Sequence, residues 1–518
     1  MRRVSAALGL SLLYASFYYL PLLERRAFYF IPDFFQFLIL PSLVSVLVLT
    51  PLFFIIGSAK FSPRVRAAVL FGGAFVMTAM AVKCVLDAAG YPWMALLQRV
   101  LHAYFNESTE AVRLARRIVV AIWLAAILIV LFLARRRLVR CLRFLSILGY
   151  AFFLLALCRC LSGELGVHLN APVAVAIGAP QVQAPAAPRR VVWVIFDEMD
   201  YRLGLGAGSP LLPNINHLAE RAVSATAAYS PGRDTSYSIP ALLTGTSIEG
   251  FARTAGGNLQ LSRVGGGKVV LDTEHSVFAQ IPGGAASATV LGFYHPYCRL
   301  FPALRACHSS YHGNAGRWFD SLVFFGDNAL GASRNMRIPE QVMPEWILMA
   351  FDPMYRASTA SLARLDAVLA DKAGVLDFIH LNFPHLPNSY AAHVLKRNEV
   401  IGDDAYKTNM MYADLVLGKI VSTLAAQSGE QEILLIVSSD HWYRESSKAP
   451  APVPFIAWRV GAGREQARSL TAPLSTVHSA ALASGFLNGR LSSQSDLADF
   501  LQSRPFAPTW MAPVDYRE

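Results

Sequence analysis

The chain has 518 residues, of which 54% are hydrophobic, and 46 basic against 35 acidic residues give it a net charge of +11. This length allows a membrane region and one large soluble domain. Much of the basic excess sits in short clusters beside apolar runs in the first 160 positions, which argues against a nucleic-acid-binding protein with a basic folded face.

The first 160 residues predict a helical transmembrane bundle. Five apolar segments are long enough to span a bilayer, at about 5–23, 29–57, 67–86, 118–134 and 144–160. Two of the loops between them are basic, through Lys60, Arg64 and Arg66 and through Arg135, Arg136, Arg137, Arg140 and Arg143. Both loops share a side with the N-terminus, so the positive-inside rule places that side in the cytoplasm and everything after residue 160 outside. We therefore predict a multi-pass protein of a bacterial-type inner membrane with a periplasmic or extracellular domain.

Residues 161–190 predict a linker, because the Ala- and Pro-rich run from 179 to 188 is too poor in large apolar residues to fold alone. Residues 191–518 form the predicted soluble domain. This domain holds only two of the cysteines, Cys298 and Cys307. Two cysteines this close in the sequence of an exported domain predict a disulfide.

The soluble domain has the pattern of alternating strands and helices. The run Val191-Val-Trp-Val-Ile-Phe196 is continuously apolar, as in a strand that is covered on both faces. Helical periodicity follows over 213–223, and further strands are expected at 268–271, 287–293, 375–381, 432–438 and 453–458. A long helix before the strand at 432–438 is marked by four apolar positions: Met411, Leu415, Ile420 and Leu424. This alternation predicts an α/β domain with a mainly parallel central sheet.

Carboxylates and histidines follow four of these strands, at the ends where parallel α/β sheets bind ligands. The pairs Asp197-Glu198 and Asp440-His441 come after two strands, and His385 and His295 come after two others. Carboxylate oxygens and imidazole nitrogens are ligands that zinc and manganese accept. The sequence therefore predicts a divalent-metal site, for zinc or manganese. His380, which lies inside the strand at 375–381, is expected in the core.

Four short segments, in this order along the chain, resemble the alkaline phosphatase/sulfatase superfamily. Asp197-Glu198 stands where sulfatases have a metal-binding Asp-Asp, and residues 212–219 resemble the stretch that follows it. Thr235-Ser-Tyr-Ser-Ile-Pro-Ala-Leu-Leu-Thr-Gly245 matches the nucleophile segment, and Ser439-Asp-His441 matches the second metal motif. The resemblance implies the fold of that superfamily, with Thr235 as the nucleophile.

The departures from the sulfatase pattern narrow the activity that the resemblance implies. Sulfatases need a Cys or Ser at the position of Thr235, because that side chain is oxidised to formylglycine, and threonine cannot give that aldehyde. Ile239 replaces the Arg of the sulfatase nucleophile string, and Phe293 replaces the sulfate-binding Lys. Hydrolysis of sulfate esters is therefore disfavoured. A threonine nucleophile behind an N-terminal membrane bundle is instead similar to lipid A phosphoethanolamine transferases and lipoteichoic acid synthases.

That second resemblance implies a metal-dependent transferase that moves phosphoethanolamine or phosphoglycerol from a phospholipid to an extracytoplasmic glycan or lipid through a phosphothreonine. Its partners are a membrane lipid donor and a glycan or lipid acceptor, with no nucleic acid. In the implied site, Thr235 is both nucleophile and metal ligand, and His385 or His295 is a proton donor or phosphate ligand. The other implied metal ligands are Asp197, Glu198, Asp440 and His441.

Three alternatives stay open at the level of sequence. A membrane-bound phosphodiesterase or phosphatase would pass the phosphoryl group to water instead of to an acceptor. A non-catalytic sulfatase-like subunit would keep the fold alone, although the complete set of site residues argues against it. Thr235 by itself also suits an ordinary helix N-cap, a position that Ser and Thr favour.

Overall fold

A computed structural model describes residues 187–207, 212–253, 258–310, 353–385, 405–444 and 449–504, with the isolated positions 62, 150, 151, 154 and 506. Among these residues, none of the helices combines the length and the apolar character that crossing a membrane requires. Apart from the four isolated positions up to 154, the predicted membrane bundle lies outside the described residues, as does all but the end of the predicted linker.

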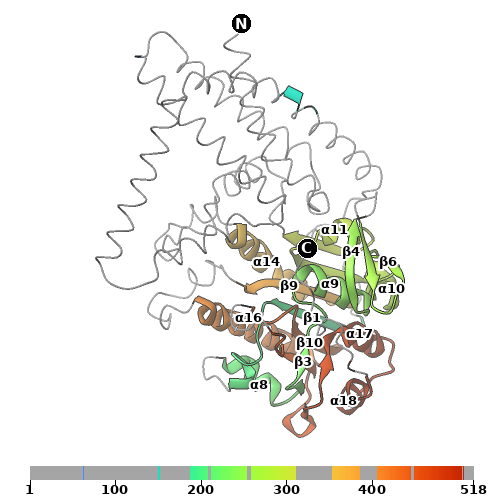
Figure 1. The fold of residues 1–518 in the computed structure, drawn as a ribbon. Helices are drawn as coiled ribbons and strands as arrows, with labels where there is room; N and C mark the ends of the chain where they lie inside the picture. The colour runs from blue at the N-terminus through green and yellow to red at the C-terminus, as the bar shows by residue number, and fades with distance from the viewer. Residues whose placement is uncertain are drawn as a thin grey trace, which may run out of the picture. The chain divides into compact units, whose positions relative to one another are not determined.

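An eight-stranded sheet forms the centre of the described domain (Figure 1), in the order β12-β2-β11-β10-β1-β9-β7-β8. Pairing is parallel throughout except where β11 runs antiparallel to both of its neighbours. The sheet is therefore mainly parallel, as predicted. The strands are β1 (Arg189–Asp197), β2 (Val223–Ala225), β7 (Ala288–Phe293), β8 (Ala306–Ser310), β9 (Leu376–Pro384), β10 (Glu432–Ser439), β11 (Phe455–Arg459) and β12 (Arg468–Leu470).

Strand β1 lies between β10 and β9 and is covered on both faces. Its side chains from Val191 to Phe196 are all fully buried, which is why the sequence is apolar without alternation. Trp193 packs edge-to-face on Phe378 of β9, with ring centroids 5.2 Å apart. The register between β1 and β9 shifts between Phe196 and Asp197, so the regular pairing ends where the acidic residues begin.

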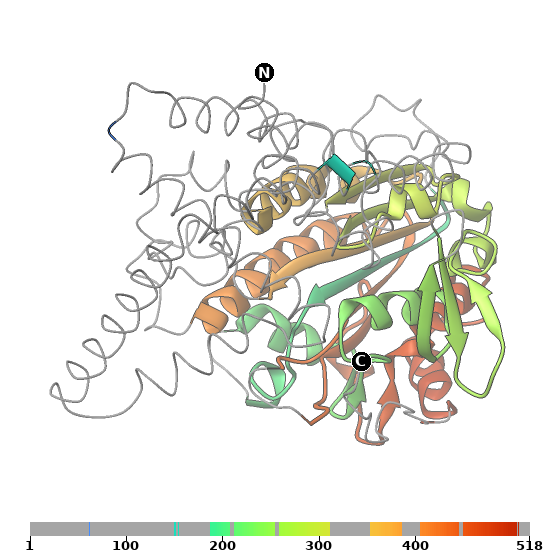
Figure 2. The same cartoon turned by 45° about the horizontal axis from the view of Figure 1, so that its top comes forward.

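Helices cover the two faces of this sheet (Figures 1 and 2). On one face, β1 residues of even number share a core with three helices, α8 (Pro213–Ala219), α14 (Pro353–Ala370) and α16 (Ala405–Gln427). On the other face, α17 (Ser479–Leu487) contacts β1 and also packs against α9 (Thr235–Thr244). The remaining described helices are α10 (Val277–Gln280), α11 (Tyr297–Leu300) and α18 (Gln494–Gln502).

Two small sheets accompany the central one. The first is antiparallel and consists of β4 (Ile248–Arg253), β5 (Leu259–Arg263) and β6 (Lys268–Val270). The second pairs β3 (Ala228–Tyr229) with β13 (Leu474–Ser475) in parallel. Three residues separate the end of α9 at Thr244 from the start of the first small sheet, and Tyr237 of that helix packs on Phe251 of β4 with ring centroids 5.0 Å apart.

One boundary of the predicted helices is wrong. The helix expected over 213–223 ends at Ala219, and Val223 instead begins β2, where it pairs with Ala457 of β11. Sheet pairing therefore overrides the helical periodicity at a β-branched residue. The long helix predicted before the strand at 432–438 is α16, in which Leu415 is 53% exposed because the buried stripe passes through Ala413, Leu417, Ile420 and Leu424.

Candidate active site

Acidic residues from two adjacent strands meet at the carboxyl edge of the sheet. Asp197 ends β1 and Glu198 follows it, while Asp440 comes directly after β10. Glu198 has a positive φ of 70°, which is uncommon for a residue other than glycine and strained. The two strand ends are joined, since the Glu198 backbone N–H donates to Asp440 Oδ1 at 3.0 Å. The strained backbone is thus held by one of the predicted metal ligands.

Thr235 is the first residue of α9. The N-cap of that helix is Asp234, whose side chain accepts a hydrogen bond from the Tyr237 backbone N–H, so the reading of Thr235 as a plain N-cap is wrong. The Thr235 hydroxyl instead donates to Asp440 Oδ2 at 2.7 Å. A side chain at Gly232 would place a Cβ only 2.6 Å from Tyr237 Cβ, so this loop can pack against the start of α9 only with glycine. The helix start therefore aims the hydroxyl at the acidic cluster.

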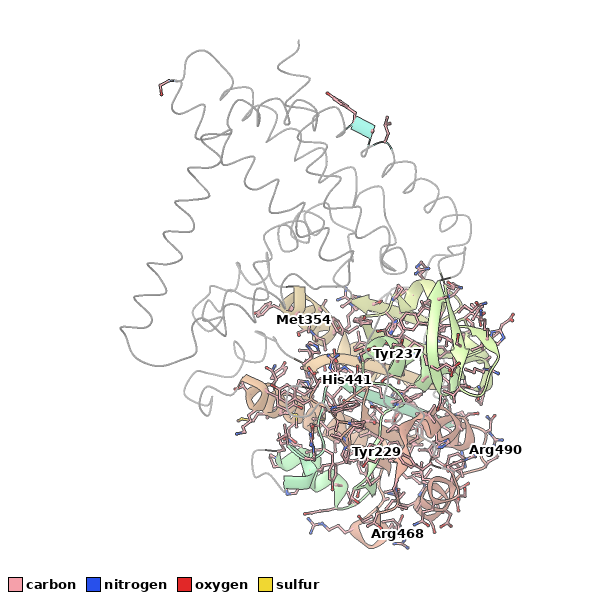
Figure 3. The ribbon with its side chains drawn as sticks, viewed as in Figure 1. Tyr229, Tyr237, Met354, His441, Arg468 and Arg490 are labelled. Atoms are coloured by element: carbon pink, nitrogen blue, oxygen red, sulfur yellow. A yellow bond between two sulfur atoms is a disulfide. The ribbon has the colours of Figure 1, made fainter. Side chains whose placement is uncertain are left out.

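His441, which Figure 3 labels, is buried and follows Asp440 after the end of β10. Its Nδ1 lies 3.0 Å from the Trp442 carbonyl oxygen, and because a carbonyl only accepts, Nδ1 carries the proton. The lone pair is therefore on Nε2, 3.5 Å from Asp197 Oδ1 and 3.4 Å from Asp440 Oδ2. Neither His441 Nε2 nor Asp197 Oδ1 has a hydrogen-bond donor or acceptor among the described residues.

These separations suit a shared metal ion. Zinc binds nitrogen and oxygen ligands at about 2.0–2.2 Å, so the edges of a tetrahedral set are about 3.4 Å long. The two distances from His441 Nε2 match that edge length, and a cation would satisfy the buried atoms that have no partner. Asp197, Asp440 and His380 also each offer a ligand atom within 4.8 Å of the others. The residues present therefore fit a divalent metal.

The electrostatics of the cluster favour a cation as well. Burial raises the pKa of Asp197 well above its usual value, and the negative charges of Asp440 and Glu198 raise it further. Burial also raises the pKa of Asp440, but His441, His380 and the hydrogen bond from Thr235 outweigh that effect and bring the pKa below its usual value. A buried cluster with this excess of carboxylates is stabilised by a bound cation.

Glu198 faces a different set of partners from Asp197. Its Oε1 lies 3.2 Å from Arg444 Nε, and its Oε2 lies 3.6 Å from His385 Nε2. The sequence left open which of the two acidic residues binds metal directly. The structure aims Asp197 into the cluster with Asp440, and it places Glu198 at the margin, between a guanidinium and an imidazole.

The two predicted catalytic histidines occupy unlike positions. His295 is fully buried, and its Nε2 lies 3.0 Å from the backbone carbonyl oxygen of Thr235. Burial lowers the pKa of His295 to about 3, so this ring is neutral and donates its N–H to that carbonyl. Tyr294 just before it has a positive φ of 74°. His385 follows the end of β9 and its side chain is 28% exposed. His295 thus contacts the backbone of Thr235, the predicted nucleophile, while His385 is partly exposed beside Glu198.

Three further residues of the site carried little signal in the sequence. His380 is buried as expected, but it belongs to the acidic cluster rather than to an apolar core. Arg444 stands beside Glu198 and has no motif of its own. Tyr406 of α16 donates to the Glu198 carbonyl oxygen at 2.8 Å and accepts from the Asp200 N–H at 3.0 Å, which supports the strained turn after β1.

A disulfide joins Cys298 of α11 to Cys307 of β8, with the two Cα atoms 5.5 Å apart. It is the pairing expected from the sequence. It fixes the loop that follows β7, and this loop carries both Tyr294 and His295.

Comparison with known proteins finds similarity among solved structures alone. No protein-family model and no curated protein matches the chain. Solved structures similar to it include a protein in the alkaline phosphatase superfamily from Vibrio parahaemolyticus, with 12% identity and a TM-score of 0.35 over 65% of this chain and 74% of that one. They also include the phosphonate monoester hydrolase of Agrobacterium radiobacter, with 14% identity and a TM-score of 0.38 over 58% and 73%.

A third similar structure is the soluble domain of lipooligosaccharide phosphoethanolamine transferase A from Neisseria meningitidis, with 14% identity and a TM-score of 0.34 over 62% of this chain and 94% of that one. One of these three proteins is in the alkaline phosphatase superfamily, which the sequence motifs resemble. The three include both a hydrolase and a transferase, and at these values the likeness does not define an activity for this chain.

Proposed function

We propose that the chain is a metal-dependent transferase that moves a phospho-head-group, phosphoethanolamine or phosphoglycerol, from a phospholipid to an extracytoplasmic glycan or lipid. One observation carries the proposal. The Thr235 hydroxyl, at the start of a helix, donates to Asp440 Oδ2. In the same cluster, the buried atoms Asp197 Oδ1 and His441 Nε2 have no hydrogen-bond partners among the described residues. A hydroxyl needs such a setting to become a nucleophile.

Asp197, Asp440 and His441 would hold the metal, with Thr235 Oγ1 beside them and Glu198 able to join from the margin. The metal supplies Lewis-acid chemistry, lowering the pKa of the threonine hydroxyl and offsetting charge on the phosphate. In the described structure the hydroxyl already points at the acidic cluster, at 2.7 Å from Asp440 Oδ2. His295 keeps it there by donating to the Thr235 carbonyl oxygen.

In the first proposed step, Thr235 Oγ1 forms a bond to phosphorus and the bond from phosphorus to the diacylglycerol oxygen breaks. The hydroxyl proton leaves through Asp440 Oδ2, and diacylglycerol departs as an alcohol after taking up one proton. Because Thr235 is the first residue of a ten-residue helix, the partial positive charge at that end of the helix would favour a phosphate bound beside Thr235. Arg444, 39% exposed beside Glu198, adds a positive charge at the same margin.

In the second proposed step, an acceptor hydroxyl attacks the phosphothreonine and the Thr235 oxygen leaves and regains a proton. His385 takes the acceptor's proton. It is the histidine suited to this role, since its side chain is 28% exposed while those of His295, His380 and His441 are at most 1% exposed. Water in place of the acceptor would make the same site a phosphodiesterase or phosphatase.

The proposed place of action is the outer side of a cell membrane. The five apolar segments and the basic loops of the sequence support an N-terminus in the cytoplasm and an exported domain. The Cys298–Cys307 disulfide supports an oxidising compartment for that domain. Attachment to a membrane would also concentrate the domain at a lipid donor.

The test uses the full chain in vesicles that contain a phospholipid labelled in its head group, with membrane glycolipid as acceptor. The wild type should transfer label to the acceptor and release diacylglycerol, and Thr235→Val, which keeps the shape but removes the hydroxyl, should do neither. Thr235→Ser serves as the matched control and should retain part of the activity. Free head-group phosphate as the sole labelled product would replace transfer by hydrolysis. Turnover retained in Thr235→Val would refute Thr235 as the nucleophile.

A further inference from the structure

His380 is a buried histidine that the proposed reaction steps do not use. It lies inside β9, and strand alternation gives it the same face as Phe378, opposite to Ile379 and Leu381 of the α16 core. One ring nitrogen, Nδ1, lies 2.9 Å from the Tyr297 hydroxyl oxygen. The other, Nε2, is buried and has no hydrogen-bond partner among the described residues. The ring also belongs to the group with Asp197 and Asp440 whose ligand atoms lie within 4.8 Å.

Tyr297 is held firmly against this histidine. Its ring lies so close to β7 that a Cβ at Gly292 would come within 2.2 Å of Tyr297 Cδ2, so only glycine leaves room for it. The next residue, Cys298, is disulfide-bonded to Cys307 of β8. Tyr297 is fully buried and its ring also contacts Phe378, with centroids 5.8 Å apart. Glycine, disulfide and aromatic packing together fix the tyrosine hydroxyl beside His380.

The hydrogen bonds of the ring decide which nitrogen is free to bind. Nδ1 is occupied by the Tyr297 hydroxyl, whereas Nε2 has no partner among the described residues. When Nδ1 donates to that hydroxyl oxygen, Nε2 keeps its lone pair. This is the tautomer that a metal-binding histidine needs.

We propose that His380 Nε2 is a further ligand of the metal ion held by Asp197 and Asp440, and that Tyr297 is a positioning residue that fixes the ring of His380. The inference rests on the metal centre of the proposed function, and it adds a residue of β9 and a residue of the disulfide-bonded loop that follows β7. Partners of metal-bound histidines typically contribute about 10–100-fold to metal affinity, so the tyrosine hydroxyl has a measurable effect.

The test measures cobalt(II) binding to the full chain, by competition with a chelator and by the visible absorption of the bound ion. His380→Gln should lower the cobalt affinity by about 100-fold or more and change the absorption spectrum. Tyr297→Phe, which removes only the hydroxyl, should lower it by about 10–100-fold. Two control variants should match the wild type: His308→Gln, a histidine of β8 that pairs with Ser310, and Tyr355→Phe, a buried tyrosine of α14.

Thermal unfolding without metal shows whether each variant is folded, so a loss of cobalt binding can be assigned to the ligand. Wild-type affinity and spectrum in a folded His380→Gln variant would overturn the inference while leaving the metal centre intact. A wild type that binds no cobalt at all would overturn both the inference and the metal centre of the proposed function. These two failures are therefore distinguishable.

Discussion

The substitution Asp197→Asn tests whether the acidic cluster is built for a metal or for stability. Asp197 is buried, its Oδ1 has no donor among the described residues, and burial together with Asp440 and Glu198 raises its pKa. A raised pKa in the folded state means that the ionised carboxylate destabilises the fold at neutral pH. We therefore expect neutral asparagine to make the metal-free protein more stable than the wild type.

The size of this gain follows from the charges involved. Two like charges 4 Å apart interact by about 4 kcal/mol at an effective dielectric of about 20, and relaxation of the site lowers that value. We expect the metal-free variant to be more stable by about 1–3 kcal/mol, which raises Tm by several degrees in a domain of this size. Excess metal should make the wild type the more stable of the two proteins. At a metal concentration of 100 times Kd, binding stabilises the wild type by about 2.7 kcal/mol, whereas the variant lacks one metal ligand.

The assay is thermal unfolding of the full chain in detergent, with chelator and then with excess zinc. Asp440→Asn is the matched control, because this carboxylate accepts hydrogen bonds from the Glu198 and His441 N–H groups and from the Thr235 hydroxyl. Each such bond to a charged group contributes about 1.5–3 kcal/mol, so Asp440→Asn should destabilise under both conditions. A metal-free Asp197→Asn protein that is clearly less stable than the wild type would refute the reasoning.

Two further predictions concern stability away from the site. Asp377→Asn leaves the buried Arg190 without its carboxylate partner, 2.6 Å from Nη2 in the wild type, and should cost about 3–5 kcal/mol in the free energy of unfolding by denaturant titration. Replacing both Cys298 and Cys307 by serine opens a loop with a sequence separation of 9, which should cost about 2.5 kcal/mol in the same titration. A fully reduced wild type should then have the same free energy of unfolding as the double variant. A clear difference between the two values would contradict this explanation.

Much of the fold could be predicted because its strands are local and strongly patterned. The run from Val191 to Phe196 is buried on both faces, so the sequence itself records a central strand. The end of α8 was harder, because Val223 continues a helical period but is held in β2 by pairing with β11. That pairing joins residues more than 200 positions apart, and no local window contains it.

The candidate site could also be predicted only in part. The proximity of Asp197, Asp440 and His441 was predictable because strand ends of a parallel sheet gather at one edge. His380 was not, because its place in the cluster depends on which face of β9 it occupies and on the register between β9 and β1. The contact of His295 with the Thr235 carbonyl oxygen likewise joins a loop after β7 to the start of α9, and only the folded chain brings the two together.

The most direct test of the central claim is mass spectrometry of the purified full chain after incubation with a phospholipid and no acceptor. We predict a mass increase equal to one phospho-head-group, located by fragmentation on Thr235, and loss of that adduct when an acceptor is added. No adduct should form when the metal is removed with a chelator beforehand, and none should form on the Thr235→Val variant. Product formation with no adduct, or with an adduct on a different residue, would contradict the account.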